Sequence, residues 1–222
     1  MFLTRFQVNP SRRASRKLLS SPHAMHAAVL SAFASPSAGT SEGRVLWRLD
    51  QHNPHRVLLY VVSPREPDLT HLVEQVGWPT TESWETRPYD KFLDSLARGQ
   101  RWAFRLTANP TRNGKPPGAE ESTSTRRFGH VTPEQQRAWL LTRCEAAGFR
   151  ITEGVAGEPD LVVRSSSTFA FPRNGQTVTL RVASFDGRLE VDDPDALRRI
   201  LALGLGHAKA YGCGLMTLAA LK

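Results

Sequence analysis

The chain has 222 residues, 40% of them hydrophobic, and its 29 lysines and arginines against 21 acids give a net charge of +8. This balance excludes a disordered basic tail and predicts a folded protein that attracts a polyanion, such as nucleic acid or an anionic membrane surface. No apolar stretch approaches the roughly 18 residues of a membrane span, and the N-terminal residues lack the order of a signal peptide. We therefore expect a soluble, cytoplasmic protein.

The first half of the chain opens with an alternating run that Asn9-Pro10 ends, which is typical of a strand because proline lacks an amide. Helical periodicity, strand-like runs and turn residues predict the next elements: a helix over 23–34, strands over 44–51 and 55–62, a short helix over 69–76 and a strand near 84–89. This β-α-β-β-α-β order is the ferredoxin-like motif.

The second half repeats this opening, because its first predicted strand, 101–108, is also ended by an Asn-Pro pair, at 109–110, before a loop over 111–130. Thr132 and Gln135 then form a capping box for a helix to Ala147. Strands are predicted over 150–152, 161–171, 176–185 and 188–191, with hairpin turns at 174–175 and 186–187. A helix over 194–203, capped by Asp192 or Asp193, and a final strand follow.

These elements predict an α+β fold of two tandem ferredoxin-like (RRM-like) domains. The first spans residues 1–95 and the second spans 96–222, with an added basic β-hairpin in the second. The two cysteines, Cys144 and Cys213, cannot build a disulfide framework and lack metal-ligand spacing, so we expect two buried thiols. The sequence indicates neither a metal site nor a cofactor.

The glycine-rich stretch GLGHAKAYGCGLMTLA, residues 204–219, places four glycines around Lys209. It follows a predicted helix and precedes a strand, which is the reverse of the order in a dinucleotide-binding turn or a P-loop. Two interpretations remain open. The glycines either supply positive φ in a tight turn, or allow backbone amides to approach a ligand beside His207 and Lys209.

Four features together resemble the CRISPR-associated endoribonucleases that process precursor CRISPR RNA, most closely the CasE branch of type I-E systems. They are the glycine-rich stretch, the N-terminal MFLTRFQVNP, His26 within PHAMHAAVLSAF, and WRLD at residues 47–50. The resemblance spans the whole chain. It implies a protein that binds the stem-loop of the CRISPR repeat and cuts at its 3′ base without metal, leaving a 2′,3′-cyclic phosphate. The mature crRNA would stay bound while the enzyme joins other subunits of the Cascade complex, with no membrane partner.

The resemblance implies that His26 is the catalytic residue, because an imidazole can deprotonate the 2′-hydroxyl or protonate the 5′-oxygen leaving group. His23 stands one helical turn earlier, where the family often has tyrosine. Relatives can carry basic residues shortly after the catalytic histidine, where this chain has alanine at 27 and serine at 31. Lys17, Arg13 and Lys209 are therefore candidates for stabilising the transition state.

The candidate RNA-binding residues lie in three segments: the basic run 11–17, the predicted hairpin 161–185 and the glycine-rich stretch. They are Arg12, Arg13, Arg16, Arg164, Arg173, Arg181, Gly204, Gly206, His207, Gly212 and Gly214. Each basic segment can instead be a solvated charged surface, whereas phosphate contacts supply most of the affinity of RNA-binding proteins.

Two other functions compete with the endoribonuclease. A non-cleaving RNA-binding scaffold of the same fold stays open because the basic residue at position 27 is missing. An enzyme that uses a small nucleotide is disfavoured, because the glycines follow a helix instead of preceding one.

Overall fold

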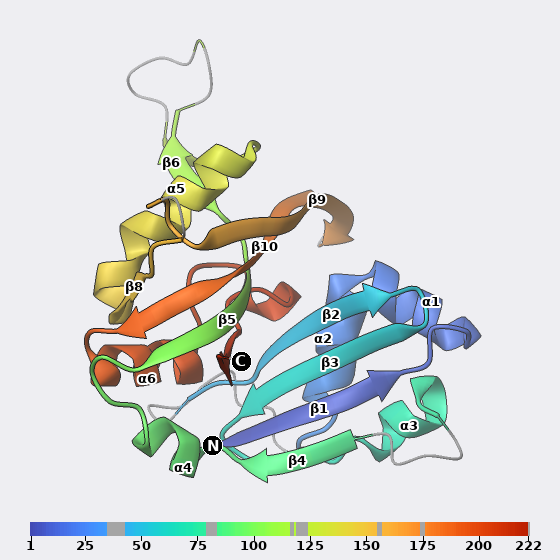
Figure 1. The fold of residues 1–222 in the computed structure, drawn as a ribbon. Helices are drawn as coiled ribbons and strands as arrows, with labels where there is room; N and C mark the ends of the chain where they lie inside the picture. The colour runs from blue at the N-terminus through green and yellow to red at the C-terminus, as the bar shows by residue number, and fades with distance from the viewer. Residues whose placement is uncertain are drawn as a thin grey trace.

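The computed structural model describes residues 1–34, 43–78, 84–115, 118, 124–154, 157–173 and 176–221. Within them the chain has a mixed α/β fold built on antiparallel sheets. Figure 1 shows the sheet of the second half above the sheet of the first half, with the chain's two ends near the region between them. No helix among these residues is long and apolar enough to cross a membrane.

The sheet of the first half has the strand order β2-β3-β1-β4, with antiparallel neighbours. Its strands are β1 (Phe2–Val8), β2 (Leu46–Asn53), β3 (Arg56–Ser63) and β4 (Trp84–Pro88). Apolar side chains on one face pack against the helices α1 (Arg13–Ser20), α2 (Pro22–Leu30) and α3 (Thr70–Val76). The β-α-β-β-α-β order of the first half is therefore present.

Helix α1 is the main difference from the prediction for the first half. The sequence shows these residues as a basic run with few apolar residues. In the structure only Ser15 and Leu18 are buried, while Arg13, Arg16 and Lys17 are exposed. The predicted helix over 23–34 is α2, which Ser21 caps by accepting a hydrogen bond from the Ala24 amide at 3.2 Å.

The sheet of the second half has the strand order β11-β5-β10-β8, and β9 also pairs with β10. Its strands are β5 (Arg101–Ala108), β8 (Phe149–Ile151), β9 (Leu161–Arg173), β10 (Gln176–Val191) and β11 (Met216–Ala220). Two further strands, β6 (Thr111–Gly114) and β7 (Arg126–Gly129), form a separate ribbon inside the predicted loop over 111–130. The helices are α5 (Pro133–Cys144) and α6 (Pro194–Leu203), and the predicted capping box of α5 is confirmed.

The predicted turn at Asp186-Gly187 is wrong, because β10 continues through both residues and pairs with β5 there. A Cβ atom on Gly187 would lie 2.5 Å from the Asp160 carbonyl oxygen and 2.9 Å from the Phe104 ring. Glycine therefore serves close packing within a strand at this position, and local sequence does not distinguish this use from a turn.

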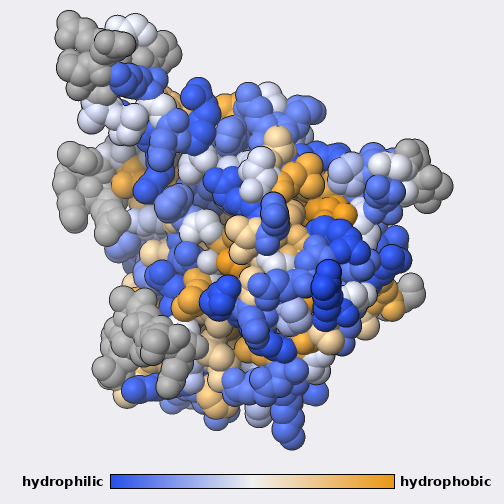
Figure 2. Space-filling model, turned by 90° about the vertical axis from the view of Figure 1, so that its left-hand side faces the viewer, coloured by the Kyte–Doolittle hydropathy of each residue, from blue (hydrophilic) through white to orange (hydrophobic). Residues whose placement is uncertain are grey.

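One hydrophobic core joins the two halves. Leu46 and Val62 of the first sheet, together with residues around the short helix α4 (Asp90–Asp94), pack against the second sheet. Cys144 and Cys213 are buried free thiols, as predicted, and burial raises the pKa of each to about 12. On the face that Figure 2 turns to the viewer, hydrophilic side chains dominate and apolar ones form small patches.

Candidate active site

Helix α2 presents His23 and His26 one turn apart, with His23 exposed and His26 half-buried. The indole nitrogen of Trp47 on β2 donates a hydrogen bond to Nδ1 of His26 at 3.3 Å. Burial lowers the pKa of His26, and the nearby charges of His23 and Arg44 lower it further. The imidazole is therefore held toward its neutral form.

Arg44 is a member of this site that sequence reasoning missed. It lies just before β2, and its backbone amide donates to the Ala202 carbonyl of α6 at 3.4 Å. Its Nε atom is buried with no hydrogen-bond partner among the described residues. The only signal in the sequence was its charge, because the chain places it near His26 through contacts between the two halves.

The glycine-rich stretch, far away in sequence, lies beside His26. The short 3-10 turn η2 (Lys209–Tyr211) packs against α2 and β2. Nζ of Lys209 donates to the Gly206 carbonyl at 2.8 Å, and the pKa of Lys209 is lowered by burial and by Arg44. The structure thus brings the element that carries Lys209 against the helix that carries His26 and His23, which are the catalytic candidate and its possible support.

Gly204, Gly212 and Gly214, which were predicted to contact RNA, have a packing role within the folded stretch. All three are buried and have positive φ, and their missing Cβ atoms would lie within 3.0 Å of protein atoms. Gly206 also has positive φ, and a Cβ atom on it would lie 3.2 Å from the ring of Trp139, while His207 is exposed. The first of the two interpretations, a tight turn with close packing, therefore describes these glycines.

The basic run 11–17 divides into two parts. Arg12 donates to the carbonyl oxygens of Val73 at 3.1 Å and of Glu74, so it holds the end of α3. Arg12 therefore has a structural role at α3, and its contact with RNA stays a prediction. By contrast, α1 presents three exposed cations at helical spacing on one face: Arg13, Arg16 and Lys17.

The long hairpin of β9 and β10 gives its arginines different environments. Arg181 donates to the Thr168 hydroxyl at 2.6 Å and to the Val131 carbonyl at 2.8 Å, and its Nε is buried. It therefore joins the hairpin to the segment after β7, and its contact with RNA stays a prediction. Arg164 is exposed and pairs with Asp186 at 3.2 Å. The side chain of Arg173 lies outside the described residues.

A second basic surface, which the sequence did not predict, surrounds a cavity of about 440 Å³ between β6, α5 and the glycine-rich stretch. Its basic lining residues are Arg112, His130, Arg143 and His207. Arg143 is held in place by Trp139, since its guanidinium lies 4.3 Å from the ring centroid and donates to the Trp139 carbonyl at 2.8 Å. We call this surface the basic cleft.

The charges in the basic cleft act on its histidines. The pKa of His130 is lowered by burial, then by Arg112 and Arg143. The pKa of His207 is lowered by burial, then by Arg127, Lys209 and Arg143. No acidic residue is among the described residues that line this cavity, so its field favours an anion.

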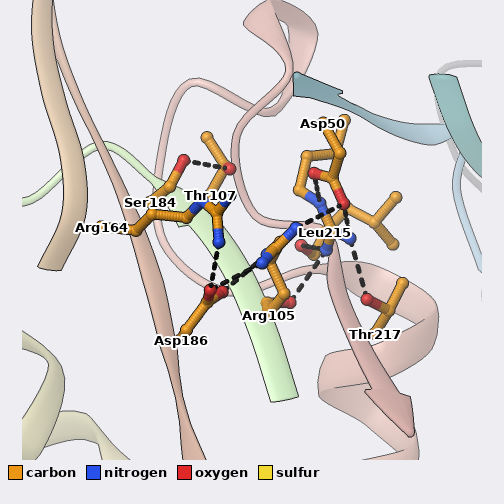
Figure 3. A network of polar contacts seen from close by, with 9 residues as sticks. Asp50, Arg105, Thr107, Arg164, Ser184, Asp186, Leu215 and Thr217 are labelled. Atoms are coloured by element: carbon orange, nitrogen blue, oxygen red, sulfur yellow. Dashed lines mark hydrogen bonds and ion pairs between the residues drawn. The ribbon is translucent and has the colours of Figure 1, made fainter. Parts of the chain in front are cut away.

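The WRLD segment connects His26 to the second half of the protein. Trp47 points toward α2, whereas the guanidinium of Arg48, on the other face of β2, is buried against the second sheet. Arg48 pairs with Asp50 at 2.7 Å, and Arg105 pairs with Asp186 at 2.6 Å and with Asp50 at 3.4 Å (Figure 3). This network fixes the strand that carries Trp47 against β5 and β10.

Groups of three or more His, Cys, Asp or Glu side chains that could hold a metal ion do not occur among the described residues. A cavity of about 410 Å³ is lined by residues of both halves, among them Trp47 of the first and Arg164, Ser184 and Gly212 of the second. The half-buried imidazole of His26 can offer acid–base chemistry, with Arg44 of the first half near it and Lys209 of the second half near Arg44.

Comparisons with known proteins show which proteins this chain is similar to. The chain is 33% identical over 228 residues to the CRISPR-associated endoribonuclease Cse3 of Thermus thermophilus, covering 99% of this chain and 100% of the relative. It is 26% identical over 186 residues to the CRISPR system Cascade subunit CasE of Escherichia coli, covering 79% and 89%. A solved structure of CRISPR endoribonuclease Cse3 bound to 19 nt RNA matches with a TM-score of 0.81 at 31% identity, covering 99% and 100%.

A family model described as CRISPR associated protein matches residues 1–220. Together with the two relatives, this match confirms the resemblance that the sequence motifs indicated. The chain belongs to the family of CRISPR-associated proteins that includes Cse3 and CasE.

Proposed function

We propose that this protein is a metal-independent endoribonuclease that binds the repeat stem-loop of precursor CRISPR RNA and cleaves at its 3′ base. The mature crRNA then stays bound while the protein serves as a subunit of a Cascade complex in the cytoplasm. The names of the relatives, an endoribonuclease and a Cascade subunit, support this function. The observation that carries it is the position of His26, half-buried beside Trp47 and the glycine-rich stretch, with cations around it.

The proposed reaction needs no group beyond the RNA and the protein. The 2′-hydroxyl oxygen attacks the adjacent phosphorus, the bond from phosphorus to the 5′-oxygen breaks, and a 2′,3′-cyclic phosphate remains. A proton leaves the 2′-hydroxyl and a proton joins the 5′-oxygen, and His26 takes part in this exchange. Arg44 and Lys209, whose charges lie close to each other, would stabilise the negative charge that develops on the phosphate.

The RNA would lie across the two basic surfaces that flank the glycine-rich stretch. On one side are the exposed cations of α1, and on the other is the basic cleft, with His207 of the stretch in its lining. Because phosphate contacts release counterions, we expect the affinity for RNA to fall steeply as salt is raised. Such surfaces recognise the shape of an RNA stem more than its bases.

We further propose that each half is a ferredoxin-like domain, divided near residues 95 and 96. In both halves the last and first strands of the half are neighbours, the third pairs with the first, and the second lies beyond the third. In the second half β8 and β9 together occupy the place of the second strand, since both pair with β10. The catalytic histidine would then belong to the first domain, and the basic cleft to the second.

The proposed function is tested by incubating the protein with its repeat RNA in EDTA. The unmodified protein should cleave, and His26→Ala should reduce the rate by about 100-fold to 10,000-fold, the usual contribution of acid–base catalysis. His55→Ala, which changes an exposed histidine in the turn between β2 and β3, is the matched control and should cleave normally. A substrate with one 2′-deoxy nucleotide just upstream of the cut should stay intact.

Cleavage that survives both His26→Ala and the 2′-deoxy substitution would contradict the mechanism. Loss of cleavage in EDTA would contradict metal independence. If the unmodified protein binds the RNA but leaves it whole, the non-cleaving scaffold is the correct function.

A further inference from the structure

The contact between Trp47 and His26 determines where the proton of the histidine lies. An indole Nε1–H can only donate a hydrogen bond, so Nδ1 of His26 must accept it. A neutral imidazole that accepts at Nδ1 carries its proton on Nε2. Nε2 has no hydrogen-bond partner among the described residues, so it is the nitrogen available to RNA.

The glycine-rich stretch leaves the indole little room to move. A Cβ atom on Gly212 would lie 2.6 Å and 2.8 Å from two carbons of the Trp47 ring. The ring is 3% exposed and belongs to the core that α2 covers, where Met25 and Val29 are also buried. The positive φ of Gly212, 78°, permits the turn that brings the backbone against the ring.

We propose that Trp47 is a positioning residue that holds His26 as the neutral imidazole with its proton on Nε2, and that the glycine-rich stretch keeps Trp47 in place through Gly212. In this form Nε2 donates a hydrogen bond toward the RNA and cannot accept the proton of the 2′-hydroxyl. If the proton moved to Nδ1, or if the imidazole took up a second proton there, the N–H groups of His26 and Trp47 would face each other and their hydrogen bond would be lost. The catalytic meaning of this inference rests on the proposed function.

Two charged groups act on His26 in the same direction as the indole: His23 on the same helix and Arg44 before β2. The elements packed against α2 also carry Lys209 and Tyr211 on η2 and the cations of α1. None of these groups is an acid that would favour the imidazolium. Removing the indole N–H therefore takes away one of several effects that favour the neutral imidazole. The equilibrium between imidazole and imidazolium should shift toward the imidazolium without being reversed.

The inference is tested first without RNA, by NMR correlation of the imidazole nitrogens and protons of His26 across pH. The unmodified protein should hold the Nε2–H tautomer. Trp47→Phe should populate Nδ1–H and move the titration of His26 upward by roughly 0.5–1 pH unit, the equivalent of one hydrogen bond. An Nδ1–H tautomer in the unmodified protein would overturn the inference whether or not the variant folds.

Two matched pairs of variants distinguish a role of Trp47 in positioning His26 from general damage to the hydrophobic core. Trp139→Phe changes another buried indole that packs on a glycine of the same stretch, and it should leave the His26 titration unchanged. Gly212→Ala should shift the titration as Trp47→Phe does. Gly99→Ala has a similar φ of 83° but open space around the new Cβ, and it should not.

The pH dependence of RNA cleavage then connects the tautomer to the reaction. With Trp47→Phe the pH–rate profile should move in the same direction as the titration of His26, whereas Gly99→Ala should keep the original profile. An unmoved profile in Trp47→Phe would contradict the positioning role. Because the NMR measurement needs no RNA, failure of the proposed function and failure of this inference give different results.

Discussion

At the scale of single residues, the pKa values of three histidines are lowered by the same two causes. His26, His130 and His207 each have a pKa below the ordinary value of 6.5, chiefly because of partial burial and then because of neighbouring cations. The folded protein therefore binds their protons less readily than the unfolded chain does. The stabilisation is present above the ordinary pKa and is lost as the pH falls through it.

This difference predicts that the free energy of unfolding decreases between pH 7 and pH 5. Urea unfolding at constant ionic strength measures the decrease. The free energy of unfolding should depend less on pH in a triple variant with His26→Gln, His130→Gln and His207→Gln. The control variant His55→Gln should keep the pH dependence of the unmodified protein. Equal slopes in all three proteins would show that the lowered histidine pKa values do not contribute.

At the scale of elements, side chains next to a helix determine where it begins. The Thr132 hydroxyl accepts from the Gln135 amide at 3.3 Å, and the Gln135 side chain accepts from the Thr132 amide. Asp193 caps α6 in a similar way by accepting from the amides of Asp195 and Ala196. These bonds satisfy amides that have no partner within the helix, which is why local sequence predicted both starts.

We expect Thr132→Ala to lower the free energy of unfolding by about 1 kcal/mol, within the usual range for an N-cap. Urea unfolding by circular dichroism measures the change. Thr142→Ala, at an exposed position inside the same helix, is the matched control and should cost less because it removes no cap. If the two variants lose the same stability, the capping box does not stabilise α5.

At the scale of the whole molecule, a buried arginine holds the two halves together. Arg48 is 1% exposed and donates to Asp50, to the carbonyls of Arg105 and Leu215, and to the Thr217 hydroxyl at 2.9 Å. Figure 3 shows its partners on β2, β5 and the segment at β11. These bonds compensate for the cost of burying the charge, and they align the strand of Trp47 with the second sheet.

Removing this guanidinium should destabilise the protein strongly. Arg48→Met leaves Asp50 buried without its main partner, and we expect a loss of about 3–5 kcal/mol in the free energy of unfolding. Arg5→Met breaks an exposed ion pair with Glu85 and should cost about 0–1 kcal/mol. Chemical denaturation compares the two, and a similar small loss in both would contradict the role of Arg48 between the halves.

Sequence patterns predicted much of the fold because they report on local structure. Alternation marked the strands, and capping residues marked the starts of α5 and α6. They failed where a local pattern has two physical causes. The cations of α1 concealed a helix that buries only two residues, and Gly187 was read as a turn although it allows close packing inside a strand.

By itself, the sequence determined the types and order of most elements, the two buried thiols and the motifs that indicated the family. The tertiary structure decided what the candidate residues do. It gave Arg12 and Arg181 internal partners, placed Arg44 near His26, and set the glycines against Trp47 and other protein atoms. Charge and conformational freedom can be read from a residue's identity, but a residue's partners are supplied by chain segments distant in sequence, and only folding brings those segments together.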